Sequence, residues 1–189
     1  MAESVVVIPL DGWGHAVARL IAGARDDVVV ARDASLAPAA RLAVVVLAGP
    51  TADDARLDLE AHAVPHLAVE RDEHSVWVGP TVLPGHAGCH RCSRARRRQH
   101  TDALLRGPDP VAADDPELWR HGARAALAVI RRVLAAPESE AGVTRRFVPG
   151  VPAPLAGRVV PVWGCPRCDP LTPLAAGWSV RTGGVTATA

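Results

Sequence analysis

Short runs of aliphatic residues, many of them β-branched, recur through residues 4–69 and predict strands. The runs within residues 4–10 and 41–48 are apolar almost throughout instead of alternating with polar residues, as expected for strands that are covered on both faces. Between the aliphatic runs, residues 12–23 and 51–63 have the spacing and end signals of helices. Strands and helices that alternate at such short intervals indicate a mainly parallel sheet with helices on both faces. The predicted strands are residues 4–10, 27–31, 41–48 and 65–69.

The second half of the chain follows a different pattern. The longest predicted helix, residues 116–136, starts at a proline and carries a continuous apolar face. A loop rich in Asp, Pro and Gly precedes it at residues 101–116. We expect one α/β domain over residues 1–170, followed by a weakly ordered tail at 171–189. Further extended segments are expected at residues 75–85, 144–148 and 157–162.

The composition of the chain argues against a nucleic-acid-binding protein and against a membrane protein. The chain of 189 residues is 49% hydrophobic but contains one Phe and no Tyr, so its core has to be aliphatic. A formal net charge of +1 gives no general reason to bind nucleic acid or an anionic membrane. No apolar segment approaches the roughly 20 residues that a membrane span requires, and no signal-peptide pattern opens the chain. We therefore expect a soluble, cytoplasmic protein.

The four cysteines form two matched pairs, Cys89-x-x-Cys92 and Cys165-x-x-Cys168. A two-residue spacer lets both thiolates of a pair face one ion, and two such pairs complete the tetrahedral shell that zinc prefers. The pairs are far apart in the sequence, so a shared ion would join two distant parts of the chain. A closed shell of four thiolates leaves no position for water or substrate, so we predict a structural zinc site.

Two other uses of the cysteines remain open, a redox-active dithiol and a pair of disulfides. The second matched pair disfavours a lone redox motif, and a reducing cytosol disfavours disulfides. His86, His90 and His100 could each replace a thiolate as a metal ligand. Because the four cysteines are already matched in spacing, we expect these three to be ordinary surface histidines.

A turn with two glycines, Gly12 and Gly14, joins the first predicted strand to the first predicted helix. Together with Asp33 it has the order of a nucleotide-binding βαβ unit, in which the acidic residue meets a ribose. Val17, however, stands where a third small residue would let the helix pack closely. We favour a strand-to-helix turn without nucleotide, with Gly12, Gly14 and Asp33 as a vestigial loop.

Four arginines, Arg94, Arg96, Arg97 and Arg98, follow the first cysteine pair. Such a cluster can bind nucleic acid, but it lacks the interleaved aromatic residues and the matching net charge of a nucleic-acid interface. We therefore expect these arginines to form a solvated helix face.

Three features now coincide: the Rossmann-like first half, the carboxy-terminal Cys-x-x-Cys, and the run Val-Gly-Pro-Thr-Val-Leu-Pro-Gly-His-Ala-Gly-Cys-His-Arg-Cys over residues 78–92. Together they resemble the ThiF/MoeB (ubiquitin-activating-enzyme-like) superfamily. More narrowly, the run is similar to that of bacteriocin-biosynthesis cyclodehydratase proteins, the SagC-like or ocin-ThiF-like partners of YcaO enzymes. The resemblance extends over about residues 5–168.

The resemblance implies a part in making thiazole or oxazole rings on a ribosomal peptide. In that family the YcaO partner uses ATP to activate a backbone amide, while the ThiF-like protein presents the leader of the precursor peptide and activates its partner. The family also implies a possible homodimer and a structural Zn²⁺, whose ligands correspond to Cys89, Cys92, Cys165 and Cys168.

Two departures from the family pattern shape the functional hypotheses. Activating enzymes hold ATP partly with a Lys, and this sequence has none, so catalysis by the chain alone is not expected. Fuller members begin with a winged-helix leader-binding domain, whereas this chain opens on the Rossmann-like strand, so leader binding could belong to another subunit. The leading hypothesis is a noncatalytic scaffold or leader-presenting subunit of an azoline-forming complex. The alternatives are an adenylating ThiF/MoeB-type enzyme and a zinc-stabilised nucleic-acid binder.

Overall fold

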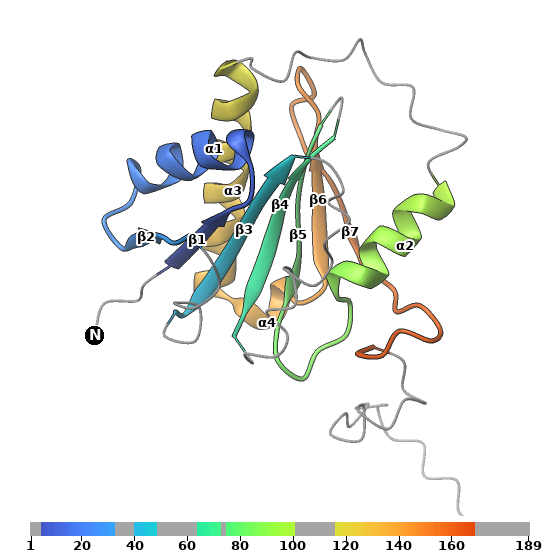
Figure 1. Ribbon diagram of the computed structural model, residues 1–189. Helices are drawn as coiled ribbons and strands as arrows, with labels where there is room; N and C mark the ends of the chain where they lie inside the picture. Colours follow the sequence, from blue (N-terminus) through green and yellow to red (C-terminus); the bar gives the residue numbers. More distant parts are fainter. Residues whose placement is uncertain (1–4, 33–39, 49–63, 73–74, 101–115, 169–189) are drawn as a thin grey trace, which may run out of the picture.

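The computed structural model of the chain describes residues 5–32, 40–48, 64–72, 75–100 and 116–168. Within these residues the chain forms a seven-stranded sheet with the strand order β2-β1-β3-β4-β5-β6-β7 (Figure 1). The strands are β1 (Val5–Pro9), β2 (Val28–Val30), β3 (Leu42–Ala48), β4 (His66–Arg71), β5 (Val76–Val82), β6 (Val143–Phe147) and β7 (Leu155–Arg158).

The four strands β2, β1, β3 and β4 run parallel to one another, and β1, α1 and β2 form a parallel βαβ unit. All four strands predicted in residues 4–69 are confirmed, with ends that differ by one or two residues. Side chains of β1 and β3 are buried on both faces of the sheet, as their uninterrupted apolar runs predicted.

The other three strand pairs, β4–β5, β5–β6 and β6–β7, are antiparallel. The prediction of a mainly parallel sheet is therefore right for one half of the sheet and wrong for the other half. The physical reason lies in the connections. Only residues 72–75 separate β4 from β5, which is enough for a tight turn between antiparallel strands and too short for a parallel crossover.

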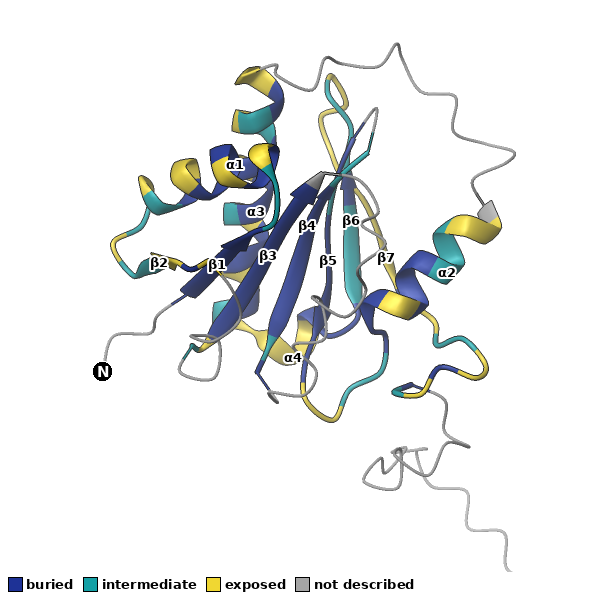
Figure 2. Ribbon diagram, viewed as in Figure 1, coloured by how far each residue is buried: buried dark blue, intermediate teal, exposed yellow. Residues whose placement is uncertain are grey.

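Two helices, α1 (Gly12–Ala22) and α3 (Pro116–Ala135), pack on one face of the sheet and on each other (Figure 1). Their apolar faces and the sheet enclose an aliphatic core that runs from β1 to β5 (Figure 2). The helices approach closely where Gly122 faces the ring of Trp13: a Cβ at Gly122 would lie 2.8 Å from that ring. The long helix predicted at residues 116–136 is confirmed, and the short α4 (Pro137–Glu140) that follows it was not predicted.

A third helix, α2 (His90–His100), lies on the opposite face of the sheet. Leu67 and Val69 of β4 point into the core beneath α1 and α3, so Glu70 points to the other face, where it contacts arginines of α2. Helices thus lie on both faces, as predicted. α2 begins in the first cysteine pair, so its position on the sheet also places the candidate site.

Several predictions fall outside the described residues, namely the helix at 51–63, the tail at 171–189, the 101–115 part of the predicted loop, and Asp33. Among the helices that the structure describes, none combines the length and the hydropathy needed to cross a membrane.

Candidate metal centre

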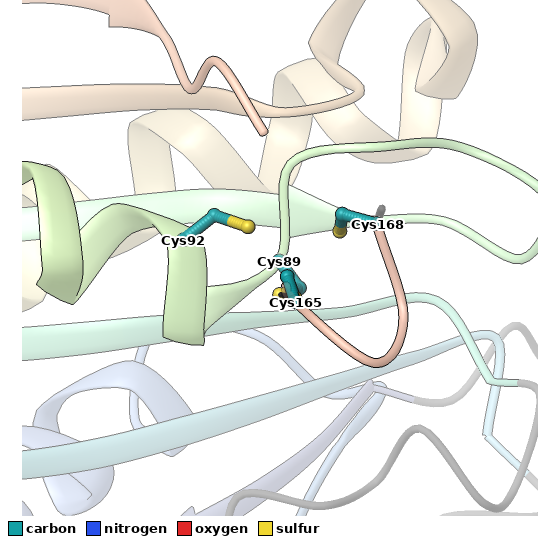
Figure 3. A group of neighbouring side chains, drawn as sticks. All are labelled: Cys89, Cys92, Cys165 and Cys168. Carbon is teal, nitrogen blue, oxygen red and sulfur yellow. Dashed lines mark hydrogen bonds between the residues drawn. The ribbon is translucent and has the colours of Figure 1, made fainter. Parts of the chain in front are cut away.

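The structure brings all four cysteines together (Figure 3). Cys89 and Cys92 lie at the start of α2, and Cys165 and Cys168 lie in the turns that follow β7. Their four Sγ atoms lie within 4.8 Å of one another, and all four side chains are buried. The predicted convergence of the two pairs is therefore observed, although 76 positions separate Cys89 from Cys165.

The geometry of the cluster fits a tetrahedral metal ion. Four sulfurs at the Zn–S distance of about 2.3 Å lie about 3.8 Å apart at tetrahedral corners. The Sγ atoms of Cys89 and Cys165 are 3.6 Å apart, close to that value. A disulfide would bring two sulfurs to about 2.05 Å, and all four cysteines are free thiols. Four buried thiols on a shared centre can therefore hold a metal ion.

Hydrogen bonds among the thiols of this cluster shift their pKa values. Hydrogen bonds from the thiols of Cys89 and Cys92 lower the pKa of Cys168 far below its usual value. The same hydrogen bonds to Cys168 raise the pKa of the Cys92 thiol to about 12 and raise that of Cys89 still further, with burial adding to both. One thiolate is thus stabilised by two neighbouring thiols. A divalent cation would displace those protons and stabilise all four thiolates together.

Backbone conformation, a hydrogen bond and apolar packing position the residues around the cluster. Gly88, just before Cys89, has a φ of 96°, and a Cβ there would lie 3.1 Å from the Cα of Gly142. On the other side of the cluster, the amide of Val162 donates a hydrogen bond to the Sγ of Cys92 over 3.4 Å. Val159 and Val162 pack against the cysteines and cover them with apolar surface. The residues after β7 are therefore tied to α2 through this centre.

The expectation of surface histidines holds for His86 and is wrong for His90. His86 is partly exposed and contacts Glu138, whose Oε2 lies 2.7 Å from its Nε2. His90, between the first two cysteines, is buried beside His66 of β4, with 5.4 Å between the ring centroids. Burial lowers the pKa of His90 well below its usual value, and His66 and nearby arginines lower it further. The side chain of His100 lies outside the described residues. His90 therefore packs as a neutral core side chain.

The prediction of a solvated arginine face on α2 is also wrong for most of the cluster. Arg94 is buried and Arg97 partly buried, and both contact the carboxylate of Glu70. Arg96 donates to the backbone carbonyls of Val160 and Pro161. Of the four, only Arg98 is exposed. These arginines hold α2 against β4 and against the segment after β7.

Sequence reasoning missed Glu70, which is 96% buried and joins two arginines of α2 to the sheet. It lies just beyond the end of the predicted strand at 65–69. The available signal was strand alternation: in β4, every second residue points away from the α1 and α3 face. Alternation therefore placed Glu70 on the face that α2 covers, but its two arginine partners, 24 and 27 positions later, become evident only in the structure.

The glycine turn of the predicted vestigial loop has a packing role in this structure. Asp11 caps α1 by accepting a hydrogen bond of 2.7 Å from the amide of Gly14. A Cβ at Gly14 would lie 2.5 Å from the carbonyl oxygen of Val46, so glycine lets α1 begin directly against β3. A Cβ at Gly12 would meet no heavy atom within 4 Å, and Val17, which belongs to α1, is fully buried.

A cavity of about 530 Å³ lies between α2 and the antiparallel half of the sheet. Trp77 of β5 lines it, and the guanidinium carbons of Arg97 and Arg146 lie 5.0 Å and 5.4 Å from the centre of that ring. The indole N–H donates to Asp72 over 2.7 Å, which fixes the orientation of the ring. Val159 and Val160, on the way to the second cysteine pair, complete an apolar wall.

The class of protein that this fold defines is an α/β protein with a mixed sheet and a split cluster of four cysteines. No protein-family model matches the chain, and no curated protein matches it. Several solved structures share the fold. The heterocyclase TruD has a TM-score of 0.53 and 20% identity, over 88% of this chain and 27% of that chain.

Two further structures extend the comparison. A heterocyclase in complex with substrate and cofactor has a TM-score of 0.60 and 18% identity, over 88% of this chain and 25% of that chain. The E. coli microcin synthetase McbBCD complex has a TM-score of 0.60 and 12% identity, over 86% of this chain and 67% of that chain. The chain spans about a quarter of the length of the two heterocyclases. At these identities the similarity concerns the fold.

Proposed function

We propose that the chain is an accessory subunit of a cytoplasmic, azoline-forming cyclodehydratase complex in ribosomal peptide (bacteriocin) biosynthesis. In this role it supports a YcaO-type partner and presents the precursor peptide, without catalysing a reaction alone. One observation carries the proposal: most of the chain shares its fold with two heterocyclases and with the McbBCD synthetase. The resemblance of residues 78–92 and the paired cysteines to SagC-like proteins supports the same assignment.

The proposed metal is a structural Zn²⁺ held by Cys89, Cys92, Cys165 and Cys168. Four soft sulfur donors at near-tetrahedral spacing are the ligand set that zinc prefers in structural sites. When bound with four thiolates, zinc supplies binding free energy to the fold and has no open position for a substrate. The residues themselves do the positioning, because they join the start of α2 to the segment after β7.

Adenylation by this chain is less well supported than the accessory role. The site residues that it requires include Gly12, Gly14 and Asp33, and Gly14 is occupied in packing α1 against the backbone of Val46. The sequence also lacks any lysine to bind the phosphates of ATP. ATP–pyrophosphate exchange by the purified chain would contradict the noncatalytic role.

Nucleic-acid binding through α2 is likewise disfavoured by the contacts of its arginines. Arg94 and Arg97 share the buried carboxylate of Glu70, and Arg96 donates to backbone carbonyls. A phosphate-binding surface requires guanidinium groups that reach outward to a nucleic acid. Arg98 alone of the four is exposed.

The experiment is reconstitution of ring formation. A YcaO protein and a precursor peptide encoded beside this chain are mixed with ATP, with and without the chain, and each ring is detected by mass spectrometry as the loss of one water. The proposal expects a stable complex with the YcaO protein and markedly faster ring formation when the chain is present. Equal ring formation without the chain, together with no complex, would reject the accessory role.

A further inference from the structure

β7 is the last strand at one edge of the sheet that the structure describes. Within the described residues, β7 has a neighbouring strand, β6, on one side only, and all four of its residues are exposed. Leu155, at its start, is a large apolar side chain with 62% of its surface exposed. A free strand edge presents unpaired backbone amides and carbonyls, and can pair with an extended segment of another chain.

The side chains of β7 divide between two different environments. Gly157 lies opposite Thr144 on β6, and both line the cavity beneath α2. Leu155, two residues earlier, lies on that same face. Ala156 and Arg158 alternate with them, so their side chains leave the strand toward the opposite face, although Arg158 also lines the cavity. A strand that paired with β7 would place every second side chain beside the cavity.

The cavity beside this edge suits a bulky apolar side chain. Its volume is about 530 Å³, and most of its lining surface is apolar, with Trp77, Val159 and Val160 in the wall. Arg96, Arg97 and Arg158 also line it. At Gly157 a Cβ would meet no heavy atom within 4 Å, so the space next to the edge is open. Sites that are concave and mostly apolar, with a few oriented polar groups, are typical of ligand pockets.

The positive charge around β7 indicates that a ligand of this edge is acidic as well as apolar. α2 contains five arginines and residues 141–168 contain four, and neither segment contains an Asp or a Glu. Glu70, Asp72 and Glu140, from elsewhere in the chain, contact this region and offset part of the charge. Arg158 donates to the carbonyls of Ala141 and Ser139, which are neutral, so its charge is retained at the edge. A second copy of the chain on this edge would bring like charges together, whereas an acidic segment would be attracted.

We propose that the free edge of β7 binds an extended peptide strand in which bulky apolar and acidic side chains alternate. The apolar side chains enter the cavity beside Trp77 and Gly157, and the acidic ones lie on the face of Arg158. Backbone hydrogen bonds to β7 supply affinity, and the alternation supplies specificity. The inference goes beyond the proposed function, because it follows from the edge, the cavity and the charge, and requires no particular complex.

The test uses the full chain and a fluorescein-labelled peptide that alternates leucine with glutamate, followed by fluorescence anisotropy. Matched peptides replace every glutamate with glutamine or with lysine, and a labelled single-stranded DNA serves as a probe of a different class. We expect saturable binding of the acidic peptide, binding at least about tenfold weaker for the glutamine peptide, and none for the lysine peptide. Equal binding of all three peptides, no binding of the acidic one, or tighter binding of the DNA would overturn the proposal.

Two variants of the same strand locate the site. Gly157→Leu fills the open space beside the cavity and should weaken binding of the acidic peptide at least about tenfold. Ala156→Leu adds a larger side chain to the opposite face of the same exposed strand, and should change the affinity by less than about threefold. Circular dichroism melting of both variants checks that the fold is retained. Equal effects of the two substitutions, or no effect of Gly157→Leu in a folded protein, would refute the assignment.

Discussion

The two halves of the sheet are stabilised in different ways. The parallel half, β2, β1, β3 and β4, lies against α1 and α3 around a core of aliphatic side chains. On the α2 side of the sheet, over β4 and the antiparallel half, the contacts are ion pairs of Glu70, arginine–carbonyl hydrogen bonds and the four-cysteine cluster. The face beneath α1 and α3 therefore depends on the burial of apolar surface, including that of Val76 and Val78 of β5. The contacts beneath α2 depend mostly on directional interactions between distant segments.

The difference indicates where stability and function reside. Apolar burial is tolerant of small changes, while a polar network loses much of its stabilisation when one partner is removed. The network half also carries the open strand edge, the cavity and most of the large exposed apolar side chains of the described residues, among them Leu155, Val160 and Trp163. We therefore expect partner contacts on the antiparallel half and a supporting role for the parallel half.

Among the substitutions proposed, loss of one cysteine should reduce stability the most. Cys168→Ser removes one of the four thiolates of the proposed zinc site. Structural zinc contributes about 10–16 kcal/mol of apparent binding free energy in zinc-finger peptides. We expect loss of bound zinc and faster amide hydrogen exchange in α2 and residues 159–168, with exchange in β1 and β3 unchanged. Ala87→Ser, which adds a hydroxyl nearby and keeps every thiol, is the control. Uniformly faster exchange over the whole sheet would contradict the separation of the two halves.

Removal of the Glu70 charge should cause the next largest loss of stability. Glu70→Gln leaves the buried guanidinium of Arg94 without its carboxylate, and breaking a buried ion pair from one side costs about 3–5 kcal/mol. Chemical denaturation measures the change in the free energy of unfolding. Glu117→Gln removes one partner of the exposed Glu117–Arg120 pair and should cost about 0.5 kcal/mol or less. Similar costs for the two substitutions would show that the Glu70 network does not stabilise α2 on the sheet.

A core substitution tests the aliphatic half directly. Leu67 of β4 is fully buried beneath α1 and α3, so Leu67→Ala should lower the free energy of unfolding by about 2–5 kcal/mol. Leu155→Ala makes the same change on the exposed edge strand, and surface changes of this kind usually cost within about 0.5 kcal/mol. Zinc content should be unchanged in both variants. A larger loss of unfolding free energy from Leu155→Ala than from Leu67→Ala would contradict the claim that the buried core beneath α1 and α3 stabilises the fold more than the exposed edge.

Substitutions in the glycine turn should cause the smallest loss of stability. Gly14→Ala places a Cβ 2.5 Å from the carbonyl of Val46, and overpacking of this kind costs about 1–3 kcal/mol. Gly12→Ala meets no neighbour and should be neutral or slightly stabilising. Thermal melting distinguishes the two. Equal melting temperatures would mean that Gly14 is not needed for the packing of α1 on β3.

The parallel half could be predicted from the sequence because β1 and β3 are uninterrupted apolar runs, typical of strands covered on both faces, and shorter apolar runs mark β2 and β4. The antiparallel half could not. Apolar and polar residues in β6 and β7 reflect ion pairs and exposure more than burial, so their pattern does not reveal the direction of pairing. The short connection at residues 72–75 was the available signal for an antiparallel turn.

The cysteine cluster could be predicted because metal-binding chemistry restricts both residue type and spacing. Its surroundings could not, because His90 and Arg94 are polar residues that are buried only through partners distant in the sequence, His66 and Glu70. Local composition predicts exposure for such residues. Only the tertiary structure shows what they contact.

Metal content and coordination of the purified chain test the central claim most directly. We predict one zinc ion per chain, and an X-ray absorption spectrum with four sulfur neighbours at about 2.3 Å. Protein without metal, or zinc with nitrogen or oxygen among its neighbours, would contradict a closed centre of four thiolates that joins α2 to the segment after β7.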